Sequence, residues 1–180
     1  MAQVRELITF IGENPDREGL LDTPKRVIQA MQEHFIGYTM DPAEELSRTF
    51  SEIEGYDQMV LLTGIDVHSH CEHHMVPFFG RAHVGYIPSG KVIGLSKIPR
   101  IIDMFSRRLQ VQERLTQQIL IALQALLETD NVAVSIHATH YCVKSRGVMD
   151  SNSETSTTAL GGIFKTNVHT RAEFLHSRKS

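Results

Sequence analysis

Metal-capable side chains gather in one short segment of this 180-residue chain. The run from His70 to His74 reads HCEHH, which places a thiol, a carboxylate and three imidazoles side by side. The chain has 10 histidines, and five of them fall between His68 and His83. On its own, a Cys-x-x-His spacing also occurs in ordinary polar turns with surface histidines. The segment therefore predicts a metal site only if a second group of ligands joins it.

The second group is the run His140-Tyr141-Cys142. We predict a strand over 132–143, which includes this run. Because side chains alternate along a strand, the His140 imidazole and the Cys142 thiol would lie on the same face of it. The alternative is a core cysteine beside a histidine that ends the strand. The chain has only 2 cysteines, and each is accompanied by histidine. This pairing favours a shared metal, and thiolate with imidazole favours zinc over magnesium or calcium.

The spacing of the residues does not decide whether His73 or His74 joins the two cysteines as the third ligand. In a regular strand Cys71 and His73 face the same side, whereas Cys71 and His74 converge only if the chain turns. Periodicity alone therefore favours His73. Two cysteines and one histidine leave the fourth zinc position open, which is typical of a catalytic site. Because two thiolates neutralise Zn²⁺ formally, we expect a mild Lewis acid that needs a general acid, and the remaining histidines suit that role.

The elements that must position these residues follow from hydrophobic periodicity and turn signals. We expect helices in the first forty residues, one of them with Thr23 as N-cap and Pro24 at its first position. Strand, strand, helix, helix and strand are then expected, in that order, over 59–70, 81–87, 97–105, 111–127 and 132–143. The polar run 151–158 is interpreted as a strand with buried hydroxyls. The stretch after Gly161-Gly162 is expected to close the sheet.

This order predicts an α+β fold in which an antiparallel sheet carries two helices on one face and is preceded by N-terminal helices. We expect a single domain over 1–180, mainly helical over 1–55 and with the sheet in 56–180. The formal net charge of −3 gives no overall basic surface for nucleic acid. Without a secretory signal or an apolar run of ~18 to 20 residues, a cytoplasmic protein that binds no membrane is expected.

Several motifs, in the right order, resemble those of one family. The chain is similar to type I GTP cyclohydrolases from about Leu21 to Leu175, through CEHHMVPFFGRAHVGYIP at 71–88 and then VIGLSKIPRI, QVQERLTQQI and HYCVKSRGV. The resemblance implies the tunnelling fold, in which small antiparallel sheets with helices on one side assemble into barrels. It also implies a homodecamer of two pentamers with sites at subunit interfaces. Because little sequence precedes Thr23, no N-terminal helical extension is expected.

The resemblance also implies an activity. It implies zinc-dependent hydrolysis of GTP that opens the imidazole ring and gives formate and 7,8-dihydroneopterin 3′-triphosphate, the first step of tetrahydrofolate and pterin biosynthesis. It implies Cys71, His74 and Cys142 as the zinc ligands, which replaces the choice of His73 that periodicity favours. His73 and His140 are then expected to transfer protons, in an order that the sequence leaves open.

The same resemblance implies which residues hold the substrate. Glu113 is expected to accept from N1–H and the 2-amino group of guanine, with Gln112 beside it. A local cationic patch for the ribose and triphosphate is implied, because the sequence has no P-loop pattern. Its members are Ser96, Lys97, Arg100, Arg146 and Arg26. Taken singly, Glu113 is more often a solvated residue at a helix start, and each of the others a surface charge or a helix cap.

Two other functions fit parts of this pattern. The closest is another tunnelling-fold enzyme that acts on a pterin or a deazapurine, because such relatives share a carboxylate that anchors the heterocycle. The second, from a different class, is a structural zinc module or a noncatalytic regulator of pterin synthesis. A closed four-ligand site or the absence of His140 would favour that class.

Overall fold

The computed structural model describes residues 1–45, 49–50 and 55–177, and the chain divides into two compact units. The first unit, Met1–Ile36, is helical. It contains α1 (Ala2–Phe10), the 3-10 helix η1 (Glu18–Leu20) and α2 (Thr23–His34). The helices expected in the first forty residues are thus confirmed, and α1 precedes the helix that contains Thr23. Asp22 stands at the N-cap position, one residue before the predicted Thr23, and Pro24 lies in the first turn as expected.

The second unit, Gly37–Ser180, holds the sheet. The 3-10 helix η2 (Ile36–Tyr38) includes the last residue of the first unit and the first two of the second. Along the chain the second unit then contains α3 (Pro42–Glu45), β1 (Thr49–Phe50), β2 (Val60–Cys71), β3 (Pro77–Tyr86), β4 (Val92–Ile93), α4 (Lys97–Ser106), β5 (Leu109–Gln110), α5 (Gln112–Leu127), β6 (Val132–His140), α6 (Tyr141–Lys144), β7 (Thr155–Leu160), α7 (Gly162–Thr166) and α8 (Val168–Ser177). A mixed α+β fold is thus confirmed. Parts of the predicted helical segment, 46–48 and 51–54, lie outside the described residues. The single-domain organisation stays a prediction.

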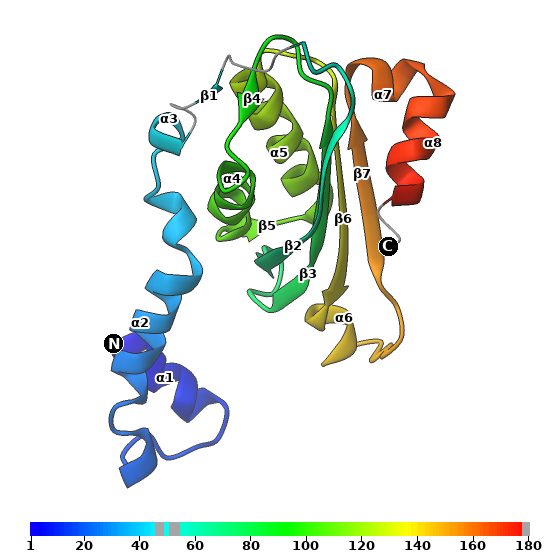
Figure 1. Cartoon of the computed structure of the whole chain (residues 1–180). Coiled ribbons are helices and arrows are strands. Elements are labelled where there is room, and N and C mark those ends of the chain that lie inside the picture. The colour runs from blue at the N-terminus through cyan, green and yellow to red at the C-terminus, as the bar shows by residue number, and fades with distance from the viewer. Residues whose placement is uncertain (46–48, 51–54, 178–180) are drawn as a thin grey trace. The chain divides into compact units, whose positions relative to one another are not determined.

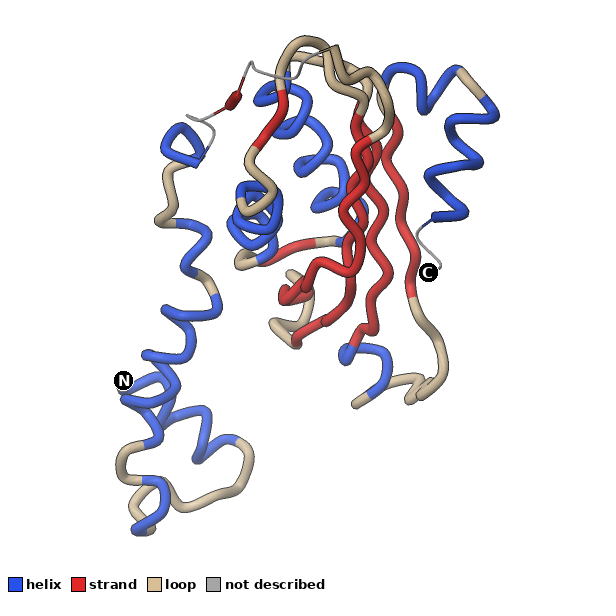
Figure 2. Tube along the Cα trace, viewed as in Figure 1, coloured by secondary structure: helices blue, strands red, loops and turns tan. Residues whose placement is uncertain are grey.

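The main sheet has five strands in the order β5-β2-β3-β6-β7. Its long strands pair antiparallel, whereas β5 runs parallel to β2 through His70↔Leu109 and Cys71↔Gln110. The sheet is therefore mixed at one edge and not wholly antiparallel. Figure 2 shows the long strands twisting about one another, as right-handed strand twist requires. A separate two-stranded sheet joins β1 and β4.

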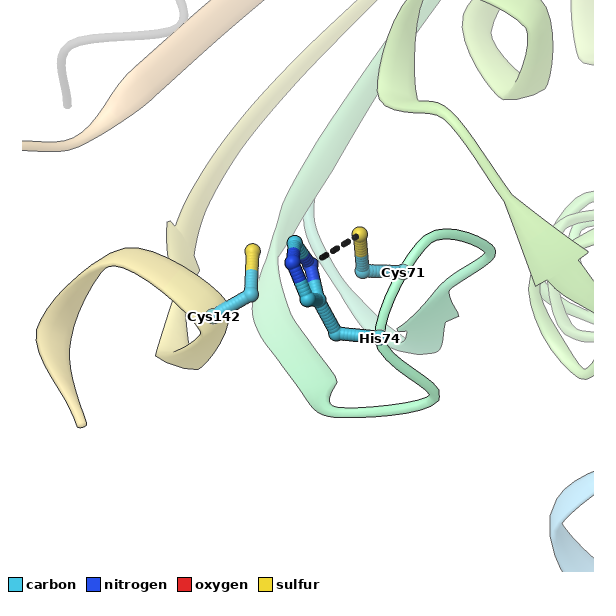
Figure 3. Close-up of side chains that lie close together, drawn as sticks. All are labelled: Cys71, His74 and Cys142. Carbon is cyan, nitrogen blue, oxygen red and sulfur yellow. Dashed lines mark hydrogen bonds between the residues drawn. The ribbon is translucent and has the colours of Figure 1, made fainter. Parts of the chain in front are cut away.

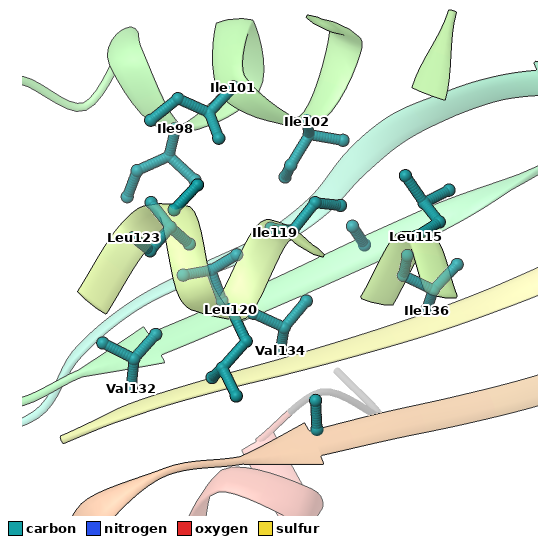
Figure 4. Close-up of a cluster of buried hydrophobic side chains, with 14 of the residues drawn as sticks. Ile98, Ile101, Ile102, Leu115, Ile119, Leu120, Leu123, Val132, Val134 and Ile136 are labelled. Atoms are coloured by element: carbon teal, nitrogen blue, oxygen red, sulfur yellow. The ribbon is translucent and has the colours of Figure 1, made fainter. Parts of the chain in front are cut away.

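A hydrophobic core lies between one face of the main sheet and the helices α4 and α5 (Figure 4). Apolar residues recur on these helices at i, i+3 and i+4 spacing, and on β6 at every second position. All of the following are 0% exposed: Ile98, Ile101, Ile102, Leu115, Ile119, Leu123, Val132, Val134 and Ile136. Burying each such side chain contributes about 1.5–3 kcal/mol, so this core holds the strands in register beneath the helices.

The opposite face of the sheet is covered by α7 and α8, which Figure 1 shows on the far side of the sheet from α4 and α5. Ala133 of β6 packs there against Phe164 and Phe174, whose rings meet edge to face at 5.8 Å. The expectation that this segment closes the sheet as a strand is wrong. Gly162 adopts φ +45°, and the Asn131 side chain accepts the Ile163 N–H at 2.9 Å, so the chain enters a helix.

Two strand predictions also need correction at their ends. The strand predicted over 132–143 ends at His140, where the helical turn α6 begins. The strand predicted over 151–158 is β7, and its hydroxyls are mostly exposed, with Thr157 half-buried. β7 lies at the edge of the sheet and, within the described residues, pairs only with β6. Within the described residues, no helix is long and apolar enough to cross a membrane.

Candidate metal centre

The turn after β2 brings the first two candidate ligands together. β2 ends at Cys71, and the chain reverses at once: the Met75 N–H donates to the Cys71 carbonyl at 2.8 Å, and the Cys71 N–H donates to the Val76 carbonyl at 2.9 Å. Met75 has φ +53°, a left-handed conformation that is uncommon outside glycine. The reversal carries His74 back toward Cys71. Strand periodicity stops at Cys71, so it cannot choose between the two following histidines.

The third candidate ligand comes from the end of another strand. Cys142 lies in α6, directly after β6 ends at His140. β3 lies between β2 and β6, and its first residues pair with both, as His70↔Pro77 and Phe78↔His140. The register of β3 therefore sets the ends of β2 and β6 side by side. The convergence of Cys142 on Cys71 rests on this register and on a helical turn, and not on the predicted continuation of the strand.

The ligand atoms of Cys71, His74 and Cys142 all lie within 4.8 Å of one another (Figure 3). Cys71 Sγ is 3.9 Å from His74 Nδ1 and 3.8 Å from His73 Nδ1, so Cys71 alone does not distinguish the two histidines. The group of three that includes Cys142 contains His74. Cys71 is buried, Cys142 half-buried and His74 exposed, so the group opens to solvent on one side.

The electrostatics of this group suit a shared cation. Both cysteines are free thiols. Burial raises the pKa of the Cys142 thiol, the adjacent Cys71 raises it further, and Arg146 partly offsets this. A thiol with a raised pKa becomes a thiolate when a divalent ion replaces its proton, so metal binding at Cys142 releases a proton. Soft sulfur donors with one imidazole fit zinc in number and kind.

His140 lies beside this group but faces a different set of partners. Its Nε2 is 2.8 Å from the Gln112 side-chain oxygen, and its ring stacks on Phe78 at 4.5 Å between centroids. Burial lowers the pKa of His140, and the nearby Glu113 carboxylate partly restores it. His140 is thus biased toward the neutral imidazole, which can both give and take a proton.

His73 and the residues around it form the outer side of the site. The His73 side chain is 64% exposed, and its Nε2 lies 3.9 Å from a Glu72 carboxylate oxygen. Glu72 also pairs with Arg114, whose guanidinium donates to the Leu109 carbonyl at 3.2 Å. The sequence analysis missed Arg114 and also Phe78. Arg114 is 42 positions from Glu72, so neither periodicity nor spacing could reveal the pair.

The residues implied for the guanine base and the ribose lie on α4 and α5. Glu113 is exposed in the first turn of α5, whereas its neighbour Gln112 is 1% exposed and points inward. Ser96 is the N-cap residue of α4, although its hydroxyl makes no capping hydrogen bond. Lys97 and Arg100 follow it in the first turn of α4.

The remaining cations come from two other segments. Arg146 follows α6, and its guanidinium lies 3.4 Å from His74 Nε2, which places it directly against the metal-capable group. Arg26 lies on α2 in the first unit, where it pairs with Asp22 at 3.4 Å. Arg146 is thus an implied phosphate-binding residue that lies against the candidate metal centre.

Known proteins resemble this chain over almost its whole length. The profile of the family described as GTP cyclohydrolase I matches residues 1–179. A GTP cyclohydrolase 1 from Chlorobaculum tepidum is 54% identical over 172 residues, which cover 96% of this chain and 76% of that protein. One from Brucella canis is 51% identical over 174 residues, 97% and 82% of the two chains. A crystal structure of the archaeosine synthase QueF-Like in the apo form aligns at 20% identity and a TM-score of 0.49, covering 58% of this chain and 93% of that one.

Proposed function

Because the chain belongs to the GTP cyclohydrolase I family, we propose that it opens the imidazole ring of GTP by hydrolysis. A second hydrolysis releases formate from the opened ring, and the ribose then rearranges and closes on the freed amines to give 7,8-dihydroneopterin 3′-triphosphate, in the first step of tetrahydrofolate and pterin biosynthesis. The observation that carries this proposal is the convergence of Cys71, His74 and Cys142, from two separate strand ends, on one solvent-facing point. A zinc-dependent hydrolase needs such an open metal position, whereas a structural zinc site is closed by four protein ligands.

Cys71, His74 and Cys142 would hold the zinc ion, leaving one coordination position for solvent or substrate. When bound, zinc supplies Lewis acidity that lowers the pKa of water, so that water can attack C8 of the purine. The buried Cys71 would fix the inner side of the site. The exposed His74 would form its outer wall, so substrate has access from the solvent side.

His140 and His73 would transfer the protons that ring opening requires. Protonation at N7 makes C8 more electrophilic, and the C–N cleavage then leaves an amine. His140, biased toward the neutral form and near Glu113, suits a group that alternates between acid and base. His73 is exposed beside the carboxylate of Glu72 and could exchange protons with solvent. Which histidine acts first stays open.

Glu113 would bind the guanine edge. Its carboxylate is exposed in the first turn of α5 and lies close enough to His140 for its charge to raise the pKa of that ring. A carboxylate there can accept from N1–H and the 2-amino group together. Binding the base at this point would present its five-membered ring to His140. Gln112 directly precedes Glu113, but its side chain is buried and does not point toward solvent as that of Glu113 does.

Ser96, Lys97, Arg100, Arg146 and Arg26 would bind the ribose and triphosphate. The chain as a whole is acidic, with a formal net charge of −3, so a polyanionic substrate needs such a local cluster. Arg146 is 3.4 Å from His74, which supports phosphate or ribose binding next to the metal centre. Arg26 belongs to the other unit of the chain, and its role stays a proposal from the family match.

We propose further that the chain forms a homodecamer of two pentamers in the tunnelling fold, with active sites at subunit interfaces. Two different sheet edges support a ring. β7 is the edge strand on one side, and on the other β2 is covered by β5 only at His70 and Cys71 within the described residues. Because an edge offers unpaired backbone groups, β7 of one copy can pair with β2 of the next. Pairing of unlike edges is head to tail, and it produces a ring when the rotation between successive copies closes.

The test is product analysis of zinc-loaded protein incubated with GTP. We expect equimolar formate and dihydroneopterin triphosphate by HPLC. An enzyme that acts on a pterin or deazapurine would leave GTP intact, and a regulator or structural module would release no formate.

The proton-transfer roles need variants. His140→Ala and His73→Ala should each lower formate release by about 10²-fold or more while zinc content is kept. The exposed His169→Ala on α8 serves as the control and should match wild type. Wild-type formate release from both His140→Ala and His73→Ala would refute these roles.

A further inference from the structure

Gln112 is the first residue of α5, yet its side chain is buried beneath the sheet. It is 1% exposed, which is unusual for a glutamine and demands that every polar atom find a partner. Its amide group meets β6 on one side and β7 on the other. These partners fix which end of the amide carries the oxygen, and that oxygen faces His140.

The amino group of Gln112 faces three acceptors. Nε2 lies 3.1 Å from the carbonyl oxygen of Ile136, 3.1 Å from that of Thr155 and 3.1 Å from the Thr157 hydroxyl. Backbone carbonyls can only accept hydrogen bonds, so the –NH₂ group, and not the oxygen, must point at Ile136 and Thr155. The Thr157 hydroxyl is itself held by Thr116 at 2.6 Å. The amide therefore cannot flip without leaving two buried carbonyls facing an oxygen.

The other end of the amide faces His140. Gln112 Oε1 lies 2.8 Å from His140 Nε2. An amide oxygen can only accept, so Nε2 must carry the hydrogen of the neutral imidazole. The lone pair of the ring is then on Nδ1. Phe78, 0% exposed, stacks on the same ring with an interplanar angle of 12° and so holds the plane of the imidazole.

We propose that Gln112 is a positioning residue that acts through His140: it holds this histidine as the Nε2–H tautomer, so that His140 exchanges protons at the reaction centre through Nδ1. The second half of this statement rests on the proposed function. The sequence analysis placed Gln112 with Glu113 as a substrate contact. Their side chains diverge, because Glu113 is exposed and Gln112 is bonded into the sheet. The two neighbours therefore have separate roles, one on the base and one on the catalytic histidine.

The tautomer can be read directly from the nitrogen resonances of the histidine rings. Zinc-loaded protein with ¹⁵N-labelled histidine would be examined by long-range ¹H–¹⁵N correlation at about pH 8, above the ordinary imidazole pKa of ~6.5. His140→Ala identifies the His140 signals by their loss. We expect a protonated Nε2 and an unprotonated Nδ1. A His140 ring protonated at Nδ1 instead would overturn the proposal, and this wild-type measurement does not depend on any variant of Gln112 folding correctly.

Gln112→Met supplies the second measurement. It keeps the length of the side chain but removes the acceptor, so the two His140 tautomers should both be populated. The matched control is Gln117→Met, an exposed position on the same helix, which should leave the spectrum of wild type. A spectrum of Gln112→Met identical to wild type would contradict the assigned role.

Steady-state kinetics separate positioning from substrate contact. We expect Gln112→Met to lower kcat by about tenfold or more, with KM for GTP within about twofold of wild type. A raised KM with unchanged kcat would make Gln112 a substrate ligand and refute the proposal. If the protein did not convert GTP at all, the proposed function would fail while the spectra still decided the tautomer. If the protein converted GTP but the spectra showed His140 protonated at Nδ1, only the tautomer proposal would be refuted.

Discussion

At the scale of single residues, the turn after Cys71 decides which of two adjacent histidines joins the metal-capable group. His73 and His74 lie almost equally far from Cys71 Sγ, at 3.8 and 3.9 Å, and a strand would have turned His73 toward the metal. The chain reverses after Cys71 instead, and His74 is the histidine that shares the 4.8 Å group with Cys142. A turn of a few residues thus places one of two adjacent histidines, His74, in the group with Cys142.

We predict that His74→Ala loses zinc and His73→Ala keeps it. Removing one of three protein ligands should weaken zinc binding by about 100-fold or more, whereas removing a neighbour of the site should cost little. The measurement is the zinc-to-chain ratio after gel filtration, with His73→Ala as the matched control for His74→Ala. If His73→Ala lost zinc and His74→Ala kept it, the third ligand would be His73, as strand periodicity predicts.

Removal of the metal should be visible in the two cysteines. Cys71 and Cys142 are free thiols, and as ligands they would be shielded from thiol reagents. We expect slow reaction of both with a disulfide reagent in zinc-loaded protein and fast reaction after chelation. Burial raises the pKa of Cys142, so zinc competes there with a tightly held proton and its affinity should fall as pH is lowered. Equal thiol reactivity with and without chelator would count against this site.

At the scale of elements, the site depends on the close approach of β3 and β6. A Cβ atom on Gly80 would lie 2.0 Å from the His137 carbonyl oxygen and 2.7 Å from the Ala138 Cα atom, so only glycine fits between these strands. This contact lies a few residues from Pro77 and Phe78, where β3 pairs with both strands that lead to the ligands. The strand ends therefore stay together only while β3 packs closely against β6.

Gly80→Ala should accordingly separate β3 from β6. We expect the free energy of unfolding to fall by about 1–3 kcal/mol, as for other overpacked positions, and zinc retention to weaken with it. Urea unfolding and zinc content measure the two effects. Ser156→Ala is the control, since this exposed residue on β7 pairs with the same β6 segment and should change neither. Wild-type stability and zinc content in Gly80→Ala would show that the contact is not required.

The buried phenol of Tyr86, at the end of β3, should make the sheet sensitive to alkaline pH. Tyr86 is 1% exposed; burial raises its pKa above the usual 10.0, the neighbouring Tyr56 adds to this, and a hydrogen bond with the Ile93 backbone opposes it. Because the folded state holds this proton more tightly than the unfolded chain, the resulting stability is complete below pH ~10 and is lost as pH rises through the folded-state pKa.

Tyr86→Phe removes that ionisation and tests it. At about pH 9 the variant should be less stable than wild type by about 1 kcal/mol because it lacks the hydrogen bond to the backbone. At about pH 11 the difference should shrink or reverse, since only the wild type must keep a buried phenol protonated. Urea midpoints at the two pH values give the comparison. A constant difference between the two proteins would contradict the assigned pKa direction.

At the scale of the whole molecule, the open sheet edges connect the fold to assembly. β7 and most of β2 lie at opposite edges of the five-stranded sheet within the described residues. Exposed edges invite pairing with another chain, and native proteins either protect them or use them. Unlike edges can join copies head to tail, which supports the ring that we propose for this protein.

Sedimentation velocity tests the proposed assembly. A decamer has ten times the chain mass of 20.3 kDa, and a single ring half of that. We expect Thr157→Pro, on the edge strand β7, to shift the protein toward smaller species, because proline removes a backbone N–H and disrupts strand pairing. Ser153→Pro, which lies before β7, is the control. A wild-type protein that sediments as a single chain would exclude the ring.

Local sequence determined the long helices and the central part of the sheet, and it indicated the candidate residues. Apolar residues at helical spacing predicted α5 and most of α4, and alternation predicted the first part of β6, because each pattern reflects burial of one side of a regular element. The HCEHH run and the family motifs likewise indicate Cys71, His74 and Cys142 as candidate metal ligands. The helix and strand predictions agree with the structure where the period of the sequence matches the period of a regular backbone.

Tertiary structure decided how these residues meet. The turn at Met75, the helical turn at Cys142 and the register of β3 bring two strand ends to one point. The inward side chain of Gln112 depends on carbonyls of two other strands. Each of these features arises where a regular period stops or where partners lie far apart in the sequence. Hydrogen bonds and packing across the sheet, and not local propensity, set their positions.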